Sequence, residues 1–270
     1  MPSVSVIITT QDRPQLVLHA IQSVIAQDHV IHQIIIVDDG SKENIEVPLE
    51  SLQLSHLEYY RFPRPHGANA ARNLGIEKST GDYIAFLDDD DQWESSKISS
   101  QINAFQKIGA VFSYTGIHNL TPEGKTIKKR FYPTPTGSVF TNLMKDNFIG
   151  STSSIVVDRS FINQHQIRFD ETLPSMQDYD FYLSVFSYTN LIAGVPQFLV
   201  RYRQERSLWT DKTSSNFLKF KTAKEILYKK YETFNEVRYL NKSLRIIQLK
   251  KCVKYPKFLL GFLRSFISGS

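Results

Sequence analysis

The sequence contains a single cysteine, Cys252, and no apolar run long enough to span a bilayer. One thiol excludes an internal disulfide and offers no zinc-finger spacing, so a reducing compartment is expected. The first residues, 1–3, lack the basic region that opens a signal peptide and lead directly into a short apolar run. These absences predict a cytoplasmic protein.

The common sequence patterns for phosphate and metal binding are also missing. No G-x-G-x-x-G follows the first apolar run and no G-x-x-x-x-G-K-[ST] occurs, which disfavours a dinucleotide-binding unit and a P-loop. The seven histidines show no metal-ligand spacing. The formal charge is +5, but no recognised nucleic-acid motif accompanies it, so no nucleic-acid partner is expected. A nucleotide diphosphate would have to be held by a metal ion and arginines.

Four consecutive aspartates, Asp88–Asp91, directly follow the apolar run Tyr83–Leu87. The run has the length and composition of a strand in a parallel sheet, which holds ligands at the carboxyl ends of its strands. Two carboxylates about 4 Å apart repel by about 4 kcal/mol at an effective dielectric of about 20, so such a cluster favours a shared cation. Mg²⁺ and Mn²⁺ take these oxygen ligands together with substrate phosphates. A solvated acidic turn is the alternative interpretation.

Strands and helices are predicted to alternate along the first part of the chain. Apolar runs predict strands at 4–8, 33–37, 57–61, 83–87 and 110–114, and helical spacing predicts helices at 16–27, 67–80 and 94–107. Asp12 is the expected N-cap of the first helix. The alternation predicts an α/β, doubly wound and mostly parallel sheet. Because the second strand ends in Asp38–Asp39, two acidic strand ends should face one crevice, which favours the metal–phosphate interpretation.

Four segments of the sequence resemble glycosyltransferase family 2. They are Val4–Arg13, Ile-Val-Asp-Asp-Gly-Ser at 36–41, Ala-Arg-Asn-Leu-Gly at 71–75 and Phe-Leu-Asp-Asp-Asp-Asp-Gln-Trp at 86–93. The resemblance implies a Rossmann-like GT-A fold and transfer of a sugar from a nucleotide donor with inversion. It implies a catalytic domain at 1–212, with a donor half at about 1–115 and an acceptor half at about 116–212. A basic helical C-terminal region at 213–270 would follow.

The resemblance also assigns roles on the donor side. Donor-binding residues would be Thr9, Thr10, Gln11, Asp39, Arg72, Asp88 and Asp89. Asp39 would accept the uracil N3–H, whereas Asp38 would accept nearby backbone N–H groups. The D-x-D pattern maps to Asp88 and Asp90, so Asp90 would ligate Mn²⁺ or Mg²⁺ directly and Asp88 would contact the metal or the ribose. Asp91 would cap a helix beginning near residues 93–94.

On the acceptor side, Gln177-Asp178-Tyr179-Asp180 resembles the family's Glu-Asp-Tyr-Asp motif, with Gln177 in place of the usual acid. A carboxylate that opens a helix can be a simple cap. The resemblance instead implies that Asp178 is the catalytic base and Asp180 a supporting hydrogen-bond partner. The stretch 150–157 resembles the family's small-residue segment beneath the donor sugar.

Two further segments complete the expected acceptor half. The strand end and loop at 199–207 resemble the family's Arg-rich segment, in which Arg206 or Arg203 would neutralise the diphosphate. Many relatives have a metal-reaching histidine there, but this chain has Gln204. The polar segment 116–138 is predicted to be either a flap near the acceptor or a solvated hairpin.

Lysine and arginine strongly outnumber acids after Ser214. Helices are predicted at 214–234, 237–253 and 256–267. A basic helical region with an apolar end is typical of attachment to an anionic membrane surface, here the inner face of the cell membrane. Packing on the core or on a second copy of the chain is the alternative, so membrane attachment and homo-oligomer formation both stay open.

Together with these patterns, the family resemblance implies an inverting, metal-dependent enzyme that moves sugar from a UDP-sugar to a saccharide or a lipid-linked saccharide. The expected setting is bacterial surface polysaccharide synthesis of the capsule, O-antigen or teichoic acid type. Two alternatives remain: a metal-dependent phosphohydrolase or nucleotidyltransferase, and a non-catalytic module that binds sugar nucleotides or glycans.

Overall fold

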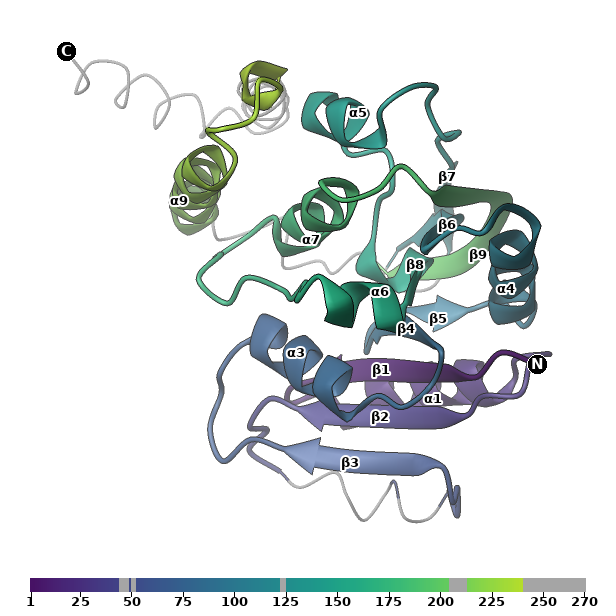
Figure 1. Cartoon of the computed structure of the whole chain (residues 1–270). Helices are drawn as coiled ribbons and strands as arrows, with labels where there is room; N and C mark the ends of the chain where they lie inside the picture. The colour runs from purple at the N-terminus through teal and green to yellow at the C-terminus, as the bar shows by residue number, and fades with distance from the viewer. Residues whose placement is uncertain (44–48, 50–51, 122–124, 204–212, 240–270) are drawn as a thin grey trace.

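The computed structural model describes residues 1–43, 49, 52–121, 125–203 and 213–239 (Figure 1). Its strands are β1 (Val4–Thr10), β2 (Gln33–Asp38), β3 (Leu57–Arg61), β4 (Tyr83–Asp88), β5 (Gln92–Trp93), β6 (Phe112–Leu120), β7 (Thr126–Arg130), β8 (Ile155–Asp158) and β9 (Ile192–Arg203). Its helices are α1 (Pro14–Ile25), α3 (Ala68–Lys78), α4 (Lys97–Ile108), α5 (Val139–Lys145), the 3₁₀ turn η1 (Thr152–Ser154), α6 (Arg159–Gln164), α7 (Gln177–Phe186) and α9 (Thr213–Lys230).

The strands form one nine-stranded sheet in the order β3-β2-β1-β4-β8-β6-β9-β5, with β7 paired to β6. Strands β1, β2, β3 and β4 are mutually parallel, and β6 pairs in parallel with β9. Strand β8 lies between β4 and β6 and is antiparallel to both. The predicted α/β class with a mostly parallel, doubly wound sheet is therefore confirmed.

Alternation along the buried strands divides the core between the two faces of the sheet. In β1, Val6 and Ile8 join a cluster with α1 and α4, whereas Ile7 between them joins a cluster with α3 and α7. All three side chains are at most 1% exposed. Because successive side chains of a strand point to opposite faces, a strand covered on both sides is apolar throughout.

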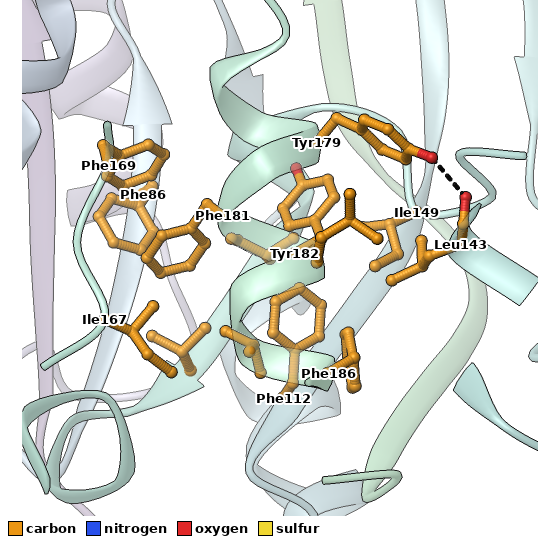
Figure 2. Packing of buried hydrophobic residues seen from close by; sticks show 14 of the residues in the cluster. Phe86, Phe112, Leu143, Ile149, Ile167, Phe169, Tyr179, Phe181, Tyr182 and Phe186 are labelled. Carbon is orange, nitrogen blue, oxygen red and sulfur yellow. Dashed lines mark hydrogen bonds between the residues drawn. The ribbon is translucent and has the colours of Figure 1, made fainter. Parts of the chain in front are cut away.

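Helix α7 is held by aromatic packing on the second of these faces (Figure 2). The ring of Phe181 stacks on Phe169 at 4.3 Å, and Tyr182 meets Phe112 edge-on at 5.6 Å. The hydroxyl of Tyr179 donates to the Leu143 carbonyl over 2.6 Å. Offset and edge-on ring pairs add about 0.5–1.5 kcal/mol each beyond the burial of their area, so the start of α7 is well fixed.

Helix α9 packs against the same face as α7 (Figure 1). Its apolar stripe, together with the residue that follows it, is buried in that cluster: Phe220, Ala223, Leu227 and Tyr231. The predicted helix at 214–234 therefore exists, although it ends at Lys230. The two helices predicted after it lie almost entirely outside the described residues. None of the helices in the described part of the chain has the length and hydropathy needed to cross a bilayer.

Two capping predictions are wrong. Asp12 has a φ of 55°, and its Oδ1 accepts the Lys42 N–H over 2.7 Å, so it braces a loop instead of capping α1. Asp91 does not cap a helix near residues 93–94, because residues 92–93 form β5 against β9 and α4 begins only at Lys97. The Asp91 carboxylate is instead completely buried.

Candidate active site

The carboxyl ends of β1, β2 and β4 meet at one edge of the sheet and open a cavity of about 320 Å³. The residues around this strand-end cavity are Thr9, Thr10, Gln11, Arg13, Asp39, Gly67, Ala68, Arg72, Asp88, Asp89 and Asp90. Every residue predicted to bind the donor is among them, as is the predicted metal ligand Asp90. The register of parallel strands causes this convergence, because Thr9 pairs with both Val37 and Asp88.

The four aspartates occupy two kinds of environment. Asp89 and Asp91 are 5% and 0% exposed, whereas the side chains of Asp88 and Asp90 are 29% and 20% exposed. Burial raises the pKa of Asp89, and it raises the pKa of Asp91 well above its usual range, with Asp88 and Asp90 adding to the effect. The two partly exposed carboxylates are therefore the ones available to a ligand.

The buried aspartates are held by hydroxyl and backbone donors. Thr10 Oγ1 donates to Asp89 Oδ2 over 2.7 Å, and Ser153 Oγ donates to Asp91 over 2.6 Å. Ser153 Oγ also accepts the Asp88 N–H over 3.1 Å. The small-residue segment at 150–157 thus holds the acidic run through Ser153, and these hydrogen bonds fix which carboxylates turn toward the cavity.

Asp38 and Asp39 have different surroundings. Asp38 is fully buried and accepts the Ser41 N–H over 2.8 Å and the Tyr59 hydroxyl over 2.7 Å. Asp39 lines the strand-end cavity and accepts the Gly67 N–H over 2.9 Å, where the chain turns into α3. Its contact with a uracil base stays a prediction.

A second cavity, of about 540 Å³, opens beside the start of α7. The residues around this α7 cavity are Arg72, Asp88, Asn119, Arg130, Asn147, Gly150, Ser151, Thr152, Gln177, Asp178 and Tyr202. Arg72 and Asp88 line both cavities, and Arg72 Nη2 donates to Asp88 Oδ1 over 2.7 Å. One ion pair therefore forms the shared wall between the strand-end cavity and the α7 cavity.

Asp178, the predicted base, lies in the α7 cavity. It is the second residue of α7, and its Oδ1 accepts the Tyr179 N–H over 2.8 Å. Burial raises the pKa of Asp178, although Arg72 opposes the rise. Burial also works against the charge of Arg72, but the carboxylates of Asp88 and Asp178 outweigh it and raise the Arg72 pKa. A carboxylate with a raised pKa is better matched to general-base catalysis near neutral pH.

Asp180 lines neither cavity. Its fully buried carboxylate accepts hydrogen bonds from Lys230 Nζ over 2.8 Å and from the Tyr231 hydroxyl over 2.9 Å. The structure therefore places this predicted supporting residue against α9. The backbone N–H of Arg203 donates to Asp91 over 3.1 Å, whereas Arg206 and Gln204 lie outside the described residues.

Asp88 and Asp90 of the strand-end cavity suit a hard divalent cation if the substrate's phosphates supply further ligands. Within the described ranges, no three His, Cys, Asp or Glu side chains are grouped closely enough to hold a metal by themselves. Asp88 and Asp90 nevertheless line one cavity and are partly exposed, and Mg²⁺ often uses one or two carboxylates plus substrate phosphates. Because Arg72 and Arg13 now pair with these carboxylates, a cation would share or replace those ion pairs.

Sequence reasoning missed several residues of the two cavities. Arg13 donates to Asp89 over 3.0 Å and to Asp90 over 3.2 Å. The sequence could have indicated Arg13, because this residue follows a predicted strand whose carboxyl end was expected to face the aspartates. Four more residues of the α7 cavity had no predicted role of their own, although Asn119 and Arg130 belong to the segment 116–138 that was expected either near the acceptor or as a solvated hairpin: Asn119, Arg130, Asn147 and Tyr202. These four residues come from the β6–β7 hairpin, a loop and β9, whose convergence no local pattern indicates.

Comparisons with known proteins relate the chain to one family of enzymes. The family model described as Glycosyl transferase family 2 matches residues 5–166. An uncharacterized glycosyltransferase of Rickettsia bellii is 30% identical over 200 residues, which are 74% of this chain and 28% of that protein. The putative teichuronic acid biosynthesis glycosyltransferase TuaG of Bacillus subtilis is 27% identical over 93% of this chain and 95% of its own.

The fold is also found in a solved structure. The crystal structure of S. aureus TarS 1-349 in complex with UDP-GlcNAc has a TM-score of 0.68 and 14% identity. The match covers 90% of this chain and 71% of that one. The chain spans about a third or less of the length of the three rickettsial relatives, at 28%, 32% and 33%.

Proposed function

The chain belongs to glycosyltransferase family 2, and we propose that it transfers sugar from a UDP-sugar to a saccharide or lipid-linked saccharide with inversion at the anomeric carbon. The proposed setting is assembly of a bacterial surface polysaccharide. The teichuronic acid name of TuaG supports that setting, and the UDP-GlcNAc bound to TarS supports a UDP-sugar donor.

The observation that carries the proposal is the shared wall between the cavities. The strand-end cavity collects the groups expected to hold a nucleotide, and the α7 cavity contains Asp178. Arg72 and Asp88 line both. A donor in the first cavity and an acceptor in the second would therefore meet at this ion pair, which suits direct transfer from one to the other.

In the proposed mechanism Asp178 is the general base. One of its oxygens, Oδ1, is occupied by the Tyr179 N–H, and the carboxylate takes the proton of the acceptor hydroxyl as that oxygen attacks the anomeric carbon. The bond from that carbon to the diphosphate breaks on the opposite side. Arg72 lies close enough to Asp178 to stabilise the carboxylate before the proton arrives.

Residues of the strand-end cavity hold the departing nucleoside diphosphate. Arg13 and Arg72 bring positive charge to it, and Asp39 is the proposed acceptor for the uracil N3–H. Asp88 and Asp90 would hold Mn²⁺ or Mg²⁺, which when bound supplies charge stabilisation for the leaving phosphate oxygens. Arg203 and Arg206 are proposed as further cationic support.

The proposed catalytic domain covers residues 1–212, with a donor half at 1–115 and an acceptor half at 116–212. The basic region 213–270 is proposed to follow it as a helical appendage that attaches the enzyme to an anionic membrane surface. Helix α9 supports its helical character.

The test combines binding with product analysis. A thermal-shift series of nucleotide sugars with Mn²⁺ identifies the donor, because a ligand that binds the folded state raises the melting temperature. Incubation of that donor with saccharide acceptors should then yield a new glycoside of inverted configuration and free UDP. Release of pyrophosphate would indicate a nucleotidyltransferase, and acceptor-independent phosphate release a hydrolase. Binding without turnover on any acceptor would indicate a binding module.

A further inference from the structure

Arg130 brings a positive charge to the α7 cavity. The proposed mechanism of sugar transfer assigns no role to this charge. We infer that the α7 cavity binds an acceptor carrying an anionic group, a carboxylate or a phosphate, and that Arg130 is the residue that binds this group. The inference rests on the proposed function, because it assumes that the cavity beside Asp178 receives the acceptor. It adds the chemical class of that acceptor.

The sheet opens at the place where Arg130 lies. One edge of β6 pairs with β8 over Phe112–Tyr114 and with β7 over Ile117–Leu120. Thr115 and Gly116, which lie between these two pairings, pair with neither strand, so β7 and β8 do not continue one another. Arg130, the last residue of β7, pairs with Ile117 and therefore sits at this opening.

Among the described residues around the α7 cavity, one cation is left for a ligand. Arg72 pairs with Asp88 at 2.7 Å. None of the ion pairs formed between described residues involves Arg130, whose guanidinium lies 5.9 Å from the ring centroid of Tyr132. A guanidinium presents a planar fork of N–H donors that matches the two oxygens of a carboxylate or phosphate. A half-buried fork at a cavity wall is suited to that recognition.

The remaining lining suits a saccharide that carries the acid. The side chains of Asn147, Gln177 and Thr152 offer neutral donors and acceptors for sugar hydroxyls, and Tyr202 offers an aromatic ring. Asn147 Oδ1 accepts two backbone N–H groups, from Ile149 and Gly150, which orients its amide nitrogen as a donor. The cavity volume, about 540 Å³, lies within the range of small-molecule sites.

The donor does not account for Arg130. The strand-end cavity has its own cations, Arg13 and Arg72, beside the expected position of the diphosphate. Of these two cavities, Arg130 lines the α7 cavity, which also contains Asp178, and not the strand-end cavity. The anionic group would therefore lie on the sugar that receives the transfer, or on the group directly attached to it.

Three probes with one shared tail separate the sources of the anionic group. Octyl glucoside is neutral, octyl glucuronide carries a carboxylate on the sugar, and glucosyl octyl phosphate carries a phosphate at the anomeric position. Their dissociation constants are measured by calorimetry in the presence of UDP, for the full chain and for Arg130→Gln. The matched control is Lys129→Gln, which removes a positive charge from the preceding residue of β7, whose side chain is exposed.

The full chain should bind at least one anionic probe about 10- to 100-fold more tightly than octyl glucoside, since hydrogen bonds to charged groups contribute that much. Arg130→Gln should lose this preference, and Lys129→Gln should keep it. The anionic probe that is preferred identifies the source. Equal binding of the three probes, binding of none, or an unchanged preference in a folded Arg130→Gln protein would overturn the inference.

The affinity for UDP-sugar separates this inference from the proposed function. An Arg130→Gln protein that loses UDP-sugar affinity by the same factor would assign Arg130 to the donor and so overturn the inference. If the full chain binds an anionic probe but transfers no sugar from any donor, the proposed function fails while the anionic subsite stands.

Discussion

The guanidinium of Arg72 lies 2.7 Å from the carboxylate of Asp88, and this pair separates the strand-end cavity from the α7 cavity. Arg72 comes from α3 and Asp88 ends β4, so the pair joins a helix on one face of the sheet to the edge where the strands end. Arg72 also lowers the pKa of Asp178 against the effect of burial. The Arg72 side chain therefore lies beside the proposed sites of both donor and acceptor. Its removal should affect donor binding and the pKa of Asp178, and the two effects can be measured separately.

Arg72→Gln should weaken UDP-sugar binding and also shift the pH dependence of transfer. Without this cation the pKa of Asp178 rises, so the base stays protonated to a higher pH and the acid limb of the kcat/KM profile moves upward. The control is Arg201→Gln, because Arg201 pairs with Glu94 at 2.7 Å on the surface. An acid limb that stays in place in Arg72→Gln would separate Arg72 from the base.

Asp178→Asn should lower turnover by about 10²- to 10⁴-fold, the usual contribution of a general base. Donor affinity should barely change, since Asp178 lies outside the strand-end cavity. Transfer rates at saturating donor, with calorimetric UDP-sugar binding, check both statements. Glu77→Gln is the control, because Glu77 is an exposed carboxylate in α3. Weak donor binding with normal turnover would instead make Asp178 a donor-site residue.

The same Asp178→Asn protein should be at least as stable as the unaltered chain at neutral pH. Burial raises the pKa of Asp178 in the folded state, so stability falls as the pH rises from the pKa of an unfolded aspartate to this raised value, and the loss is complete above it. Below the pKa of an unfolded aspartate, about 3.9, both proteins carry a neutral group and the difference should vanish. Urea unfolding from pH 3 to 8 measures this, and a variant that is less stable at pH 7 would contradict it.

Asp90→Asn should remove the part of donor affinity that depends on Mn²⁺ while leaving the fold intact. UDP binding is measured by calorimetry with Mn²⁺ and with excess EDTA, and the two dissociation constants should become equal in the variant. Asp82→Asn is the control, since Asp82 is exposed and binds Ser3 away from both cavities. If Mn²⁺ still strengthens UDP binding in Asp90→Asn by the original factor, Asp90 is not the ligand.

Lys230→Met should destabilise the protein at pH 7 by about 1–3 kcal/mol, because it leaves the buried carboxylate of Asp180 with one partner fewer. The double variant Asp180→Asn/Lys230→Met should lose less than the sum of the two single variants, which urea unfolding can establish. The loss in Lys230→Met should shrink at acid pH, where Asp180 is protonated. Additive losses would mean that the two residues do not interact in solution.

Much of the fold could be predicted because its signals are local. Runs such as 33–37 and 83–87 are apolar throughout, which happens when a strand is covered on both faces, and each ends in acids at the sheet edge. Parallel register then brings those ends together, so the strand-end cavity follows from the order of the strands. The family resemblance added Arg72 and Asp178, whose positions depend on helices.

The residues that could not be predicted depend on partners distant in the sequence. Asp91 was expected to cap a helix, but β9 returns beside it and its carboxylate meets Ser153 and the Arg203 N–H. Asp180 sits two positions after the proposed base, yet it binds α9. Arg130 reaches the α7 cavity because β6 changes partner from β8 to β7. Each of these depends on tertiary contacts that no local pattern encodes.

The packing of α9 on α7 has a consequence for the order in which the enzyme matures during synthesis. A ribosome releases α7 well before it releases Leu227 and Tyr231, which complete the buried cluster around α7. Domains generally fold as units once their chain has emerged, and exposed apolar surface on a nascent chain invites aggregation. The sheet edge with its acids can form early, whereas the helix bearing Asp178 acquires its last contacts only when α9 has left the exit tunnel. The nascent chain should therefore become competent to bind nucleotide before it becomes competent to transfer sugar.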